Sequence, residues 1–541
     1  MSTSNDQPND RPLPSRVEIY DTTLRDGAQL EGISLTVDDK LRIAEQLDWL
    51  GVGYIEAGWP GSNPKDDELF KRAPNELQLE TSKLVAFGMT RRVKGKVDSD
   101  DTLRHLVEAN TDTVCIVGKC WDYHVLEALE TTLDEGVAMV TDSIEYLKGR
   151  GLDVLFDAEH FFDGYKRNPE FSLRVLEGAA QVGADRLVLC DTNGGALPHE
   201  VERIVSEVVS YLGPDVAIGV HLHDDTGCGV ANALAGVRGG ATQVQGTING
   251  YGERTGNCNL TTIIPNLSVK MGVETLPPGR LERLTPVAHH VAELVNMALN
   301  PQAAYVGSSA FAHKAGLHVS AIIKRSDAYE HIVPDSVGNG TRFVMSEMAG
   351  KSTIVLKAQE LGIELDGPTI NEVVDTLKHL EHEGYHFEVA DASLELLMRR
   401  ASGWEQDFFR VESFRVITDD LKAEETPGGV TTEATIKLHV GEDRRIAVAE
   451  GNGPVNALDR ALRDALDGRY PTLDLIHLTD YKVRVLDTQH GTGAITRVLL
   501  DTTDGEETWT TIGVSENIIE ASWQALSDSL VYGLLRASLR G

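Results

Sequence analysis

Residues 186–225 read RLVLCDTNGGALPHEVERIVSEVVSYLGPDVAIGVHLHDD, and this stretch decides the fold of the N-terminal half. It begins and ends with short runs rich in apolar and β-branched residues, at 186–192 and 217–225, with a longer helical stretch between them. Short apolar runs of this kind are typical of strands buried on both faces of a parallel sheet. The stretch therefore predicts one strand–helix–strand unit.

The same alternation extends over the first 270 residues. Eight strands are predicted, at 17–23, 54–60, 83–88, 113–119, 153–159, 186–192, 217–225 and 242–248. Helices are expected between them, for example at 36–51, where Thr36 can cap the helix and Gly51 can end it. Eight such units in this length predict a (β/α)8 TIM barrel. An open doubly wound sheet is the alternative, but the sequence has neither GxGxxG nor a P-loop.

The pattern changes after the barrel. Residues 1–14 are polar and Pro-rich and are expected to form a disordered tail, followed by a catalytic barrel at 15–275. Helical linker subdomains are expected at 276–402, and a C-terminal α+β regulatory domain at 403–541, with a hairpin turn at 424–433.

The C-terminal part contains an internal repeat. RIAVAEGNGPVNALDRALRDAL (445–466) aligns without gaps with WTTIGVSENIIEASWQALSDSL (509–530). Each copy is predicted to be strands followed by one amphipathic helix, which gives a small domain with pseudo-twofold symmetry. A cleft between the copies is a natural ligand site, although such repeats serve packing equally well.

The composition limits the classes of partner. The chain has 541 residues, with 50 Lys and Arg against 84 Asp and Glu, for a net charge of −34. This acidity argues against nucleic-acid binding and against association with anionic membranes. No apolar run is long enough to span a bilayer, and no signal peptide is recognised at the N-terminus. The five cysteines are odd in number and form no CxxC pair, which favours a reducing cytoplasm.

Ionisable and polar residues gather where the predicted strands end. In a TIM barrel the carboxyl ends of the strands surround the active site. The residues at these ends are Asp21, Arg25, Asp26, Glu56, Lys119, Asp157, Glu159, His160, Asp191, Thr192, Asn193, His221, His223, Asp224, Asp225, Asn249, Glu253, Arg254, Asn257 and Asn259. Their common position predicts a polar site at one rim.

The HxH pair of HLHDD is the sharpest local signal at this rim. Residues two apart on a strand point the same way, so His221 and His223 face the same side. Two imidazoles and a carboxylate can hold Zn²⁺ or Mn²⁺ and leave coordination positions open. Asp21, Asp26 and Asn257 are all available, because strands one and eight of a closed barrel are neighbours. Without a metal, the histidines would be hydrogen-bonded residues of a polar barrel mouth.

Arg25 precedes Asp26 directly, so one residue can bind an anionic substrate while the other binds a metal. A 2-oxo acid could then chelate the metal, which would polarise its keto carbon for attack by a carbanion. A structural ion pair between Arg25 and Asp26 is the alternative.

Five motifs extend this hypothesis to a family. DTTLRDGAQ (21–29), HLHDDTG (221–227), NGYGERTGNCNL (249–260), VGSSAFAHKAGLH (306–318) and ENIIEASWQAL (516–526) resemble the 2-isopropylmalate synthase/citramalate synthase/homocitrate synthase family. These enzymes condense acetyl-CoA with a 2-oxo acid. EAGWPGSNPKD (56–66), DAEHFFDGY (157–165) and AEGNGPVNALDRAL (449–462) look like the (R)-citramalate synthase branch, whose acceptor is pyruvate. Ala28 stands where isopropylmalate synthases typically have Glu, which also favours that branch.

The resemblance implies a role for each matching residue. Asp26, His221 and His223 would bind a divalent metal (Zn, Mn or Mg), with Asn257 as a further or second-sphere ligand. Arg25 would bind the keto oxygen and stabilise the alkoxide, and Thr192 would bind the pyruvate carboxylate. Glu159 would orient the substrate or the acetyl methyl group, and His318 would act as acid or base. The family often has an Asp two residues after this histidine where the chain has Ser320, so His313 is a second candidate.

The resemblance further implies an acyltransferase of isoleucine biosynthesis that releases citramalate and CoA. Alternatives are a 2-isopropylmalate or homocitrate synthase with a larger 2-oxo acid, a metal-dependent lyase or aldolase on the same barrel, and a metal-holding sensor. The repeat would be a regulatory domain inhibited by a branched-chain amino acid such as isoleucine, and the chain would form a homodimer. TRRVKGK (90–96) can meet the CoA phosphates or can be a solvated basic loop.

Overall fold

The computed structural model describes residues 11–313, 318, 321–322, 324–343, 351–406, 408–419, 431–486 and 493–540. The chain forms two compact units, each described here by itself. The first runs to Phe311 and includes Glu330–Thr341, and the second comprises Ala312–Tyr329 and the residues from Arg342 onward. The domain boundaries expected from the sequence remain predictions.

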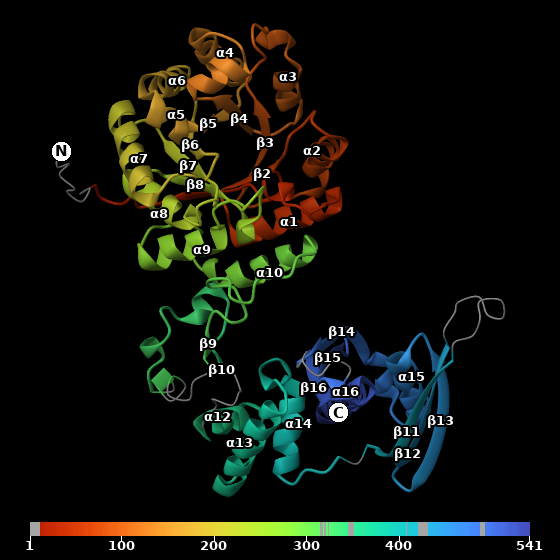
Figure 1. Ribbon diagram of the computed structural model, residues 1–541. Coiled ribbons are helices and arrows are strands. Elements are labelled where there is room, and N and C mark those ends of the chain that lie inside the picture. The colour runs from red at the N-terminus through yellow and green to blue at the C-terminus, as the bar shows by residue number, and fades with distance from the viewer. Residues whose placement is uncertain are drawn as a thin grey trace, which may run out of the picture. The chain divides into compact units, whose positions relative to one another are not determined.

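The first unit contains a closed barrel of eight parallel strands in sequential order, with helices around it (Figure 1). The strands are β1 (Glu18–Asp21), β2 (Tyr54–Gly58), β3 (Lys83–Met89), β4 (Thr113–Lys119), β5 (Asp153–Glu159), β6 (Arg186–Asp191), β7 (Ile218–Leu222) and β8 (Gln243–Gly246). The barrel closes where Glu18–Asp21 of β1 pair with Gln243–Gly246 of β8. The predicted TIM barrel and all eight predicted strands are confirmed.

The helices of this unit are α1 (Val37–Leu50), α2 (Pro64–Glu76), α3 (Asp101–Glu108), α4 (Leu133–Lys148), α5 (Phe161–Arg167), α6 (Pro169–Gln181), α7 (Pro198–Leu212), α8 (Gly229–Gly239), α9 (Leu260–Pro265) and α10 (Leu284–Leu294). The predicted ends of α1 are confirmed. Thr36 and Asp39 form a reciprocal capping box, and Gly51 ends the helix with φ of 96°.

Five strands, β1, β2, β6, β7 and β8, end earlier than predicted, and at β1 and β7 the chain turns toward the rim. β1 ends at Asp21, whose carboxylate accepts hydrogen bonds from the backbone N–H and the hydroxyl of Thr23. β7 ends at Leu222, and His223 beyond it forms an isolated bridge with Asn257. The chain therefore leaves the regular sheet at the residues that line the candidate site.

The barrel has two apolar layers. Outward-facing strand residues pack against the helices in the main core, which includes Ile19, Ile55 and Phe156. Tyr20, Val85, Phe87, Cys115 and Leu155 form a smaller cluster inside the barrel. This inner cluster fills the barrel beneath the rim and gives the rim residues a rigid floor.

The second unit contains two similar halves in its C-terminal part. One half is the antiparallel sheet β11 (Arg410–Asp419), β12 (Thr431–Val440) and β13 (Asp443–Gly451), followed by α15 (Pro454–Leu466). The other is β14 (His477–Val485), β15 (Thr496–Thr503) and β16 (Thr508–Ser515), followed by α16 (Ile518–Arg540). The predicted repeat of strands and one helix is confirmed. Residues 424–430 of the predicted hairpin turn lie outside the described residues.

The middle of the chain is only partly helical. Besides α10, it contains α12 (Lys351–Glu360), α13 (Gly367–His382) and α14 (Asp391–Ala401). Residues 299–313 and 325–343 instead form turns, short 3-10 segments and the parallel pair β9 (Ala312–His313) and β10 (Arg342–Phe343). Prolines and glycines interrupt helix formation in both stretches.

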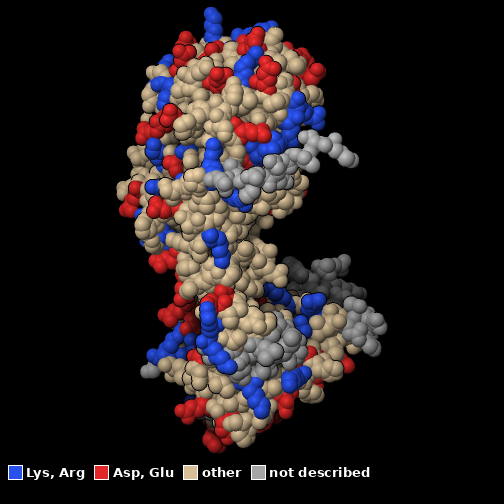
Figure 2. Space-filling model, turned by 90° about the vertical axis from the view of Figure 1, so that its left-hand side faces the viewer, with Lys and Arg blue, Asp and Glu red and all other residues tan. Residues whose placement is uncertain are grey.

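Charged side chains of both signs are interspersed over the barrel face displayed in Figure 2. On this face the excess of acidic residues is therefore not gathered into one patch. Within the described part of the chain, no helix combines the length and the apolar character that crossing a membrane requires.

Candidate active site

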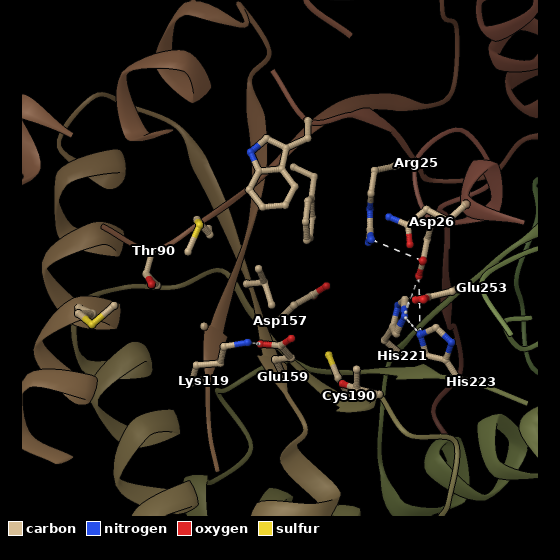
Figure 3. Close-up of a pocket in the computed structure, with 18 of the residues that line it drawn as sticks. Arg25, Asp26, Thr90, Lys119, Asp157, Glu159, Cys190, His221, His223 and Glu253 are labelled. Atoms are coloured by element: carbon tan, nitrogen blue, oxygen red, sulfur yellow. Dashed lines mark hydrogen bonds and ion pairs between the residues drawn. The ribbon is translucent and has the colours of Figure 1, made fainter. Parts of the chain in front are cut away.

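A cavity of about 320 Å³ opens at the carboxyl ends of the barrel strands (Figure 3). Its polar lining includes Arg25, Asp26, Gln29, Thr90, Lys119, Asp157, Glu159, Thr192, His221, His223, Glu253 and Arg254. Its apolar lining includes Trp59, Phe87, Met89, Val117, Leu129 and Met139. A volume near 300 Å³ with a few converging polar groups is typical of a small-molecule site.

Asp26, His221 and His223 converge at one side of this cavity. The Oδ2 atom of Asp26 lies 3.2 Å from Nε2 of His221 and 3.8 Å from Nε2 of His223. The two imidazole Nε2 atoms are 3.4 Å apart. All three side chains are buried and offer ligand atoms within 4.8 Å of one another. Two imidazole nitrogens and one carboxylate oxygen make a donor set that suits a divalent transition metal.

Two further buried atoms at this cluster lack partners. Nδ1 of His223 and Oδ1 of Asn257 have no hydrogen-bond partner among the described residues. Asn257 lies beside His223 through their backbone bridge, and its Nδ2 donates to the carbonyl of Tyr251. Unpaired buried polar atoms are rare, so the cluster has unused capacity for a ligand. The residues present therefore fit a bound metal ion.

The electrostatics of the cluster favour a carboxylate at Asp26 and a neutral imidazole at His223. Burial opposes ionisation of Asp26, but the charge of Arg25 and the close contact with His221 lower the pKa of Asp26 well below its ordinary value. Burial and the neighbouring His221 lower the pKa of His223 to about 4. Burial alone would lower the pKa of His221, but Asp26 raises it above its ordinary value. His223 is consequently neutral at neutral pH and able to bind metal.

Arg25 is held rigidly at the cavity wall. Its Nε donates to Oε1 of Glu56 at 2.6 Å, and its guanidinium carbon lies 3.9 Å from the centre of the Phe87 ring. The hydroxyl of Tyr20 donates to the other oxygen of Glu56, also at 2.6 Å. Nη1 of Arg25 approaches Asp26 at 3.6 Å. Because Glu56 and Phe87 fix one edge and one face of the guanidinium, its orientation is set before a substrate binds.

The opposite wall carries Lys119 and Glu159, which form an ion pair (Figure 3). They end β4 and β5 at paired register positions, so both side chains reach the rim from adjacent strands. Thr192 lies close by, and its hydroxyl oxygen accepts a hydrogen bond from the backbone N–H of His160 at 3.0 Å. The hydroxyl proton of Thr192 thus remains available to donate to a ligand.

Asp21 and Asp157 are buried without joining the cluster of Asp26, His221 and His223. Asp21 is bound to Thr23, and burial raises its pKa to about 7. Burial raises the pKa of Asp157 to about 6, and its Oδ1 accepts a hydrogen bond from Gln245. Of the two aspartates that spacing left open as ligands, Asp26 is the one that the fold brings to the histidines.

His318 belongs to the second unit, where its ring stacks on Tyr329 with centroids 4.2 Å apart. His313, the second candidate, lies on β9 of the same unit. The barrel cavity is formed by the first unit alone. An acid or base role for either histidine stays a prediction.

The basic loop at 90–96 differs from the expectation at one position. Arg91 is buried and forms ion pairs with Glu135 and Asp142 of α4, at 2.8 and 2.7 Å. It anchors the loop and does not extend toward a ligand, because both carboxylates already neutralise it. Arg92, Lys94 and Lys96 are exposed.

Several residues of the cavity wall, and the buried Gln245 behind it, were not given a role from the sequence. Gln245 contacts His221, Phe87 stacks on Arg25, and Trp59 and Met139 form apolar wall. The Gln-x-Gln alternation of TQVQGTI (242–248) was the available signal for Gln245, because it places two glutamines on the inner face of β8. Nothing in the local sequence marks Trp59, Phe87 or Met139 as wall residues.

Comparison with known families defines the class of protein. Residues 16–291 match the family described as HMGL-like, residues 305–385 a homocitrate synthase post-HMGL domain-like family, and residues 388–534 the LeuA allosteric (dimerisation) domain. The first match spans the barrel and the whole cavity, so the chain belongs to the HMGL-like family.

Full-length relatives identify the branch. The chain is 50% identical to an (R)-citramalate synthase of Aquifex aeolicus, over 98% of this chain and 100% of the relative. It is 51% identical to the (R)-citramalate synthase of Streptomyces coelicolor, over 97% and 98%. A probable 2-isopropylmalate synthase of Methanopyrus kandleri is 34% identical, over 95% and 97%. Within its family the chain groups with the (R)-citramalate synthases.

Proposed function

We propose that the chain is an acyltransferase that converts acetyl-CoA, pyruvate and water to (R)-citramalate and CoA. The observation that carries this proposal is the arrangement of the cavity, in which Arg25 and the cluster of Asp26, His221 and His223 face Glu159 and Lys119. One wall suits a 2-oxo acid and its developing negative charge, and the opposite wall suits the acyl group that attacks it.

Asp26, His221 and His223 would hold a divalent ion (Zn²⁺, Mn²⁺ or Mg²⁺), with Asn257 as a further or second-sphere ligand. Such an ion supplies Lewis-acid polarisation of a bound 2-oxo acid. Arg25 binds the keto oxygen and stabilises the alkoxide as carbon–carbon bond formation moves the negative charge onto it. Its fixed guanidinium is effective because it needs no reorganisation during the reaction.

Thr192 and Glu159 orient the reactants. The free hydroxyl proton of Thr192 donates to the pyruvate carboxylate, since the oxygen already accepts from His160. Glu159 orients the substrate or the acetyl methyl group, while Lys119 compensates its charge. The methyl group loses a proton to a base, a role in which we place His318, and the resulting carbanion attacks the keto carbon. Water then cleaves the thioester and CoA leaves.

The deciding experiment is a measurement of free thiol released from acetyl-CoA with Mn²⁺ or Zn²⁺ and a panel of 2-oxo acids. We expect pyruvate to far exceed 2-oxoisovalerate and 2-oxoglutarate. Preference for 2-oxoisovalerate would favour a 2-isopropylmalate synthase, and preference for 2-oxoglutarate a homocitrate synthase. Absence of thiol release with every acid would refute the synthase proposal.

We also propose that the chain forms a homodimer and is inhibited by isoleucine through its C-terminal domain. The match of residues 388–534 to an allosteric (dimerisation) domain supports both ideas. The five cysteines form no disulfide, which supports placement in the cytoplasm. Light scattering tests the dimer, and thiol release with and without isoleucine tests the inhibition. A monomeric mass, or equal rates, would refute the respective proposal.

A further inference from the structure

Strand β8 directs two buried glutamines into the barrel, Gln243 and Gln245, and neither side chain is exposed to solvent. Gln245 stands one layer nearer the rim. Its Oε1 lies 3.0 Å from Nδ1 of His221, and its Nε2 donates to Oδ1 of Asp157 at 3.1 Å. A single buried amide therefore connects a candidate metal ligand on β7 with a buried carboxylate on β5.

The direction of these two hydrogen bonds follows from the chemistry of their ends. A carboxylate only accepts hydrogen bonds, so the amide N–H₂ of Gln245 must face Asp157. The carbonyl oxygen of Gln245 then faces His221, and Nδ1 of His221 must carry a proton to donate to it. In neutral imidazole the lone pair consequently lies on Nε2.

Nε2 of His221 is the atom that points at the candidate metal position. It lies 3.2 Å from Oδ2 of Asp26 and 3.4 Å from Nε2 of His223. If the amide of Gln245 were reversed, its N–H₂ group would face Nδ1, and the imidazole proton would move to Nε2. That tautomer could not bind a metal through Nε2, so the orientation of one amide decides whether His221 is a ligand.

We propose that Gln245 is a positioning residue that fixes the tautomer and ring orientation of His221, and that Asp157 in turn fixes the orientation of the Gln245 amide. This inference rests on the metal site of the proposed function. It adds two residues, from β8 and β5, that act on the metal through His221 without contacting it.

The test is the metal affinity of the purified full-length protein, measured for Co²⁺ and Zn²⁺ by competition with a chromophoric chelator. Gln245→Met keeps the volume and removes both hydrogen bonds, and we expect affinity to fall by about 10–100-fold. Gln243→Met is the matched control, with the same residue type, strand and inward face but no contact to His221. Its affinity should stay within about twofold of the parent protein, and circular dichroism checks that each variant is folded.

The direction of the two hydrogen bonds made by Gln245 is tested by moving the carboxylate from position 157 to position 245. Asp157→Asn replaces an acceptor-only carboxylate with an amide that can donate or accept, so the orientation of the Gln245 amide is no longer enforced and affinity should weaken. In the double variant Asp157→Asn/Gln245→Glu, the new amide donates to the new carboxylate, which still accepts from Nδ1 of His221. The double variant should therefore regain affinity relative to Asp157→Asn, and this comparison remains informative even if Gln245→Met does not fold.

The outcomes separate this inference from the proposed function. Failure of the parent protein to bind either metal would refute the metal site itself. Equal affinity of the parent and Gln245→Met would overturn only the positioning role. If metal affinity falls in Gln245→Met and in Asp157→Asn but does not recover in the double variant, the proposed direction of the hydrogen bonds from Asp157 through Gln245 to His221 would be wrong.

Discussion

The imidazoles of His221 and His223 face each other with Nε2 atoms 3.4 Å apart, and both Nε2 atoms point toward Oδ2 of Asp26. His221 is the last but one residue of β7, whereas His223 lies just beyond the strand in a bridge with Asn257. The strand places the first ligand and the rim loop places the second. Loss of either imidazole leaves a donor set too small for tight metal binding.

His223→Ala should abolish metal retention and lower turnover by more than about 100-fold, because the proposed Lewis acid is then lost. Metal content by mass spectrometry and thiol release are the measurements. His199→Ala, at an exposed position of α7, is the control and should retain both properties. Full activity in His223→Ala would show that the HxH pair is not part of the active site.

Arg25→Lys should lower turnover by about 100–1,000-fold while metal content stays unchanged. Lysine keeps the charge, but it cannot keep the hydrogen bond from Nε to Glu56 together with the planar stacking on Phe87. Steady-state kinetics with pyruvate and acetyl-CoA measure the effect. A turnover within threefold of the parent would show that charge alone suffices at this position.

Lys119→Met should lower kcat/KM by at least about tenfold, because Glu159 would remain in the cavity without its cation. Lys83→Met is a matched control. Lys83 pairs with Asp153 at 3.1 Å across β3 and β5 at the opposite end of the barrel, where both side chains are exposed. If both variants lose activity equally, the effect would be one of barrel stability and not of the cavity.

Asp21→Asn should change how thermal stability depends on pH. Burial raises the pKa of Asp21 in the folded chain to about 7, from a value near 3.8. Between about pH 4 and pH 7 the unfolded chain loses this proton while the folded chain keeps it. Asp21 therefore lowers stability progressively as pH rises through this window.

The melting temperature of Asp21→Asn, relative to the parent protein, should accordingly increase from pH 4 to pH 7 by at least about 2 °C. Calorimetry at several pH values measures this difference. For Asp98→Asn, at an exposed position, the difference in melting temperature from the parent protein should be the same at every pH. A constant difference for Asp21→Asn as well would contradict the raised pKa.

The barrel, the order of its strands and the rim on which the polar residues gather follow from the amino-acid pattern alone. This is so because buried parallel strands have an apolar pattern that local composition reveals, and because consecutive strand–helix units place every strand end at the same rim. The HxH spacing and the C-terminal repeat were likewise readable, since both depend on local periodicity.

Which side chains come into contact depends on the folded barrel. Closure of β1 against β8 brings Asp26 to His221, whereas the turn at Thr23 withdraws Asp21. Arg91 forms ion pairs with Glu135 and Asp142, so it does not extend toward a ligand. The hydrogen bonds from Asp157 through Gln245 to His221 join β5, β8 and β7 across separations of 88 and 24 residues. Contacts of this kind depend on the register and closure of the barrel, which no local pattern of residues encodes.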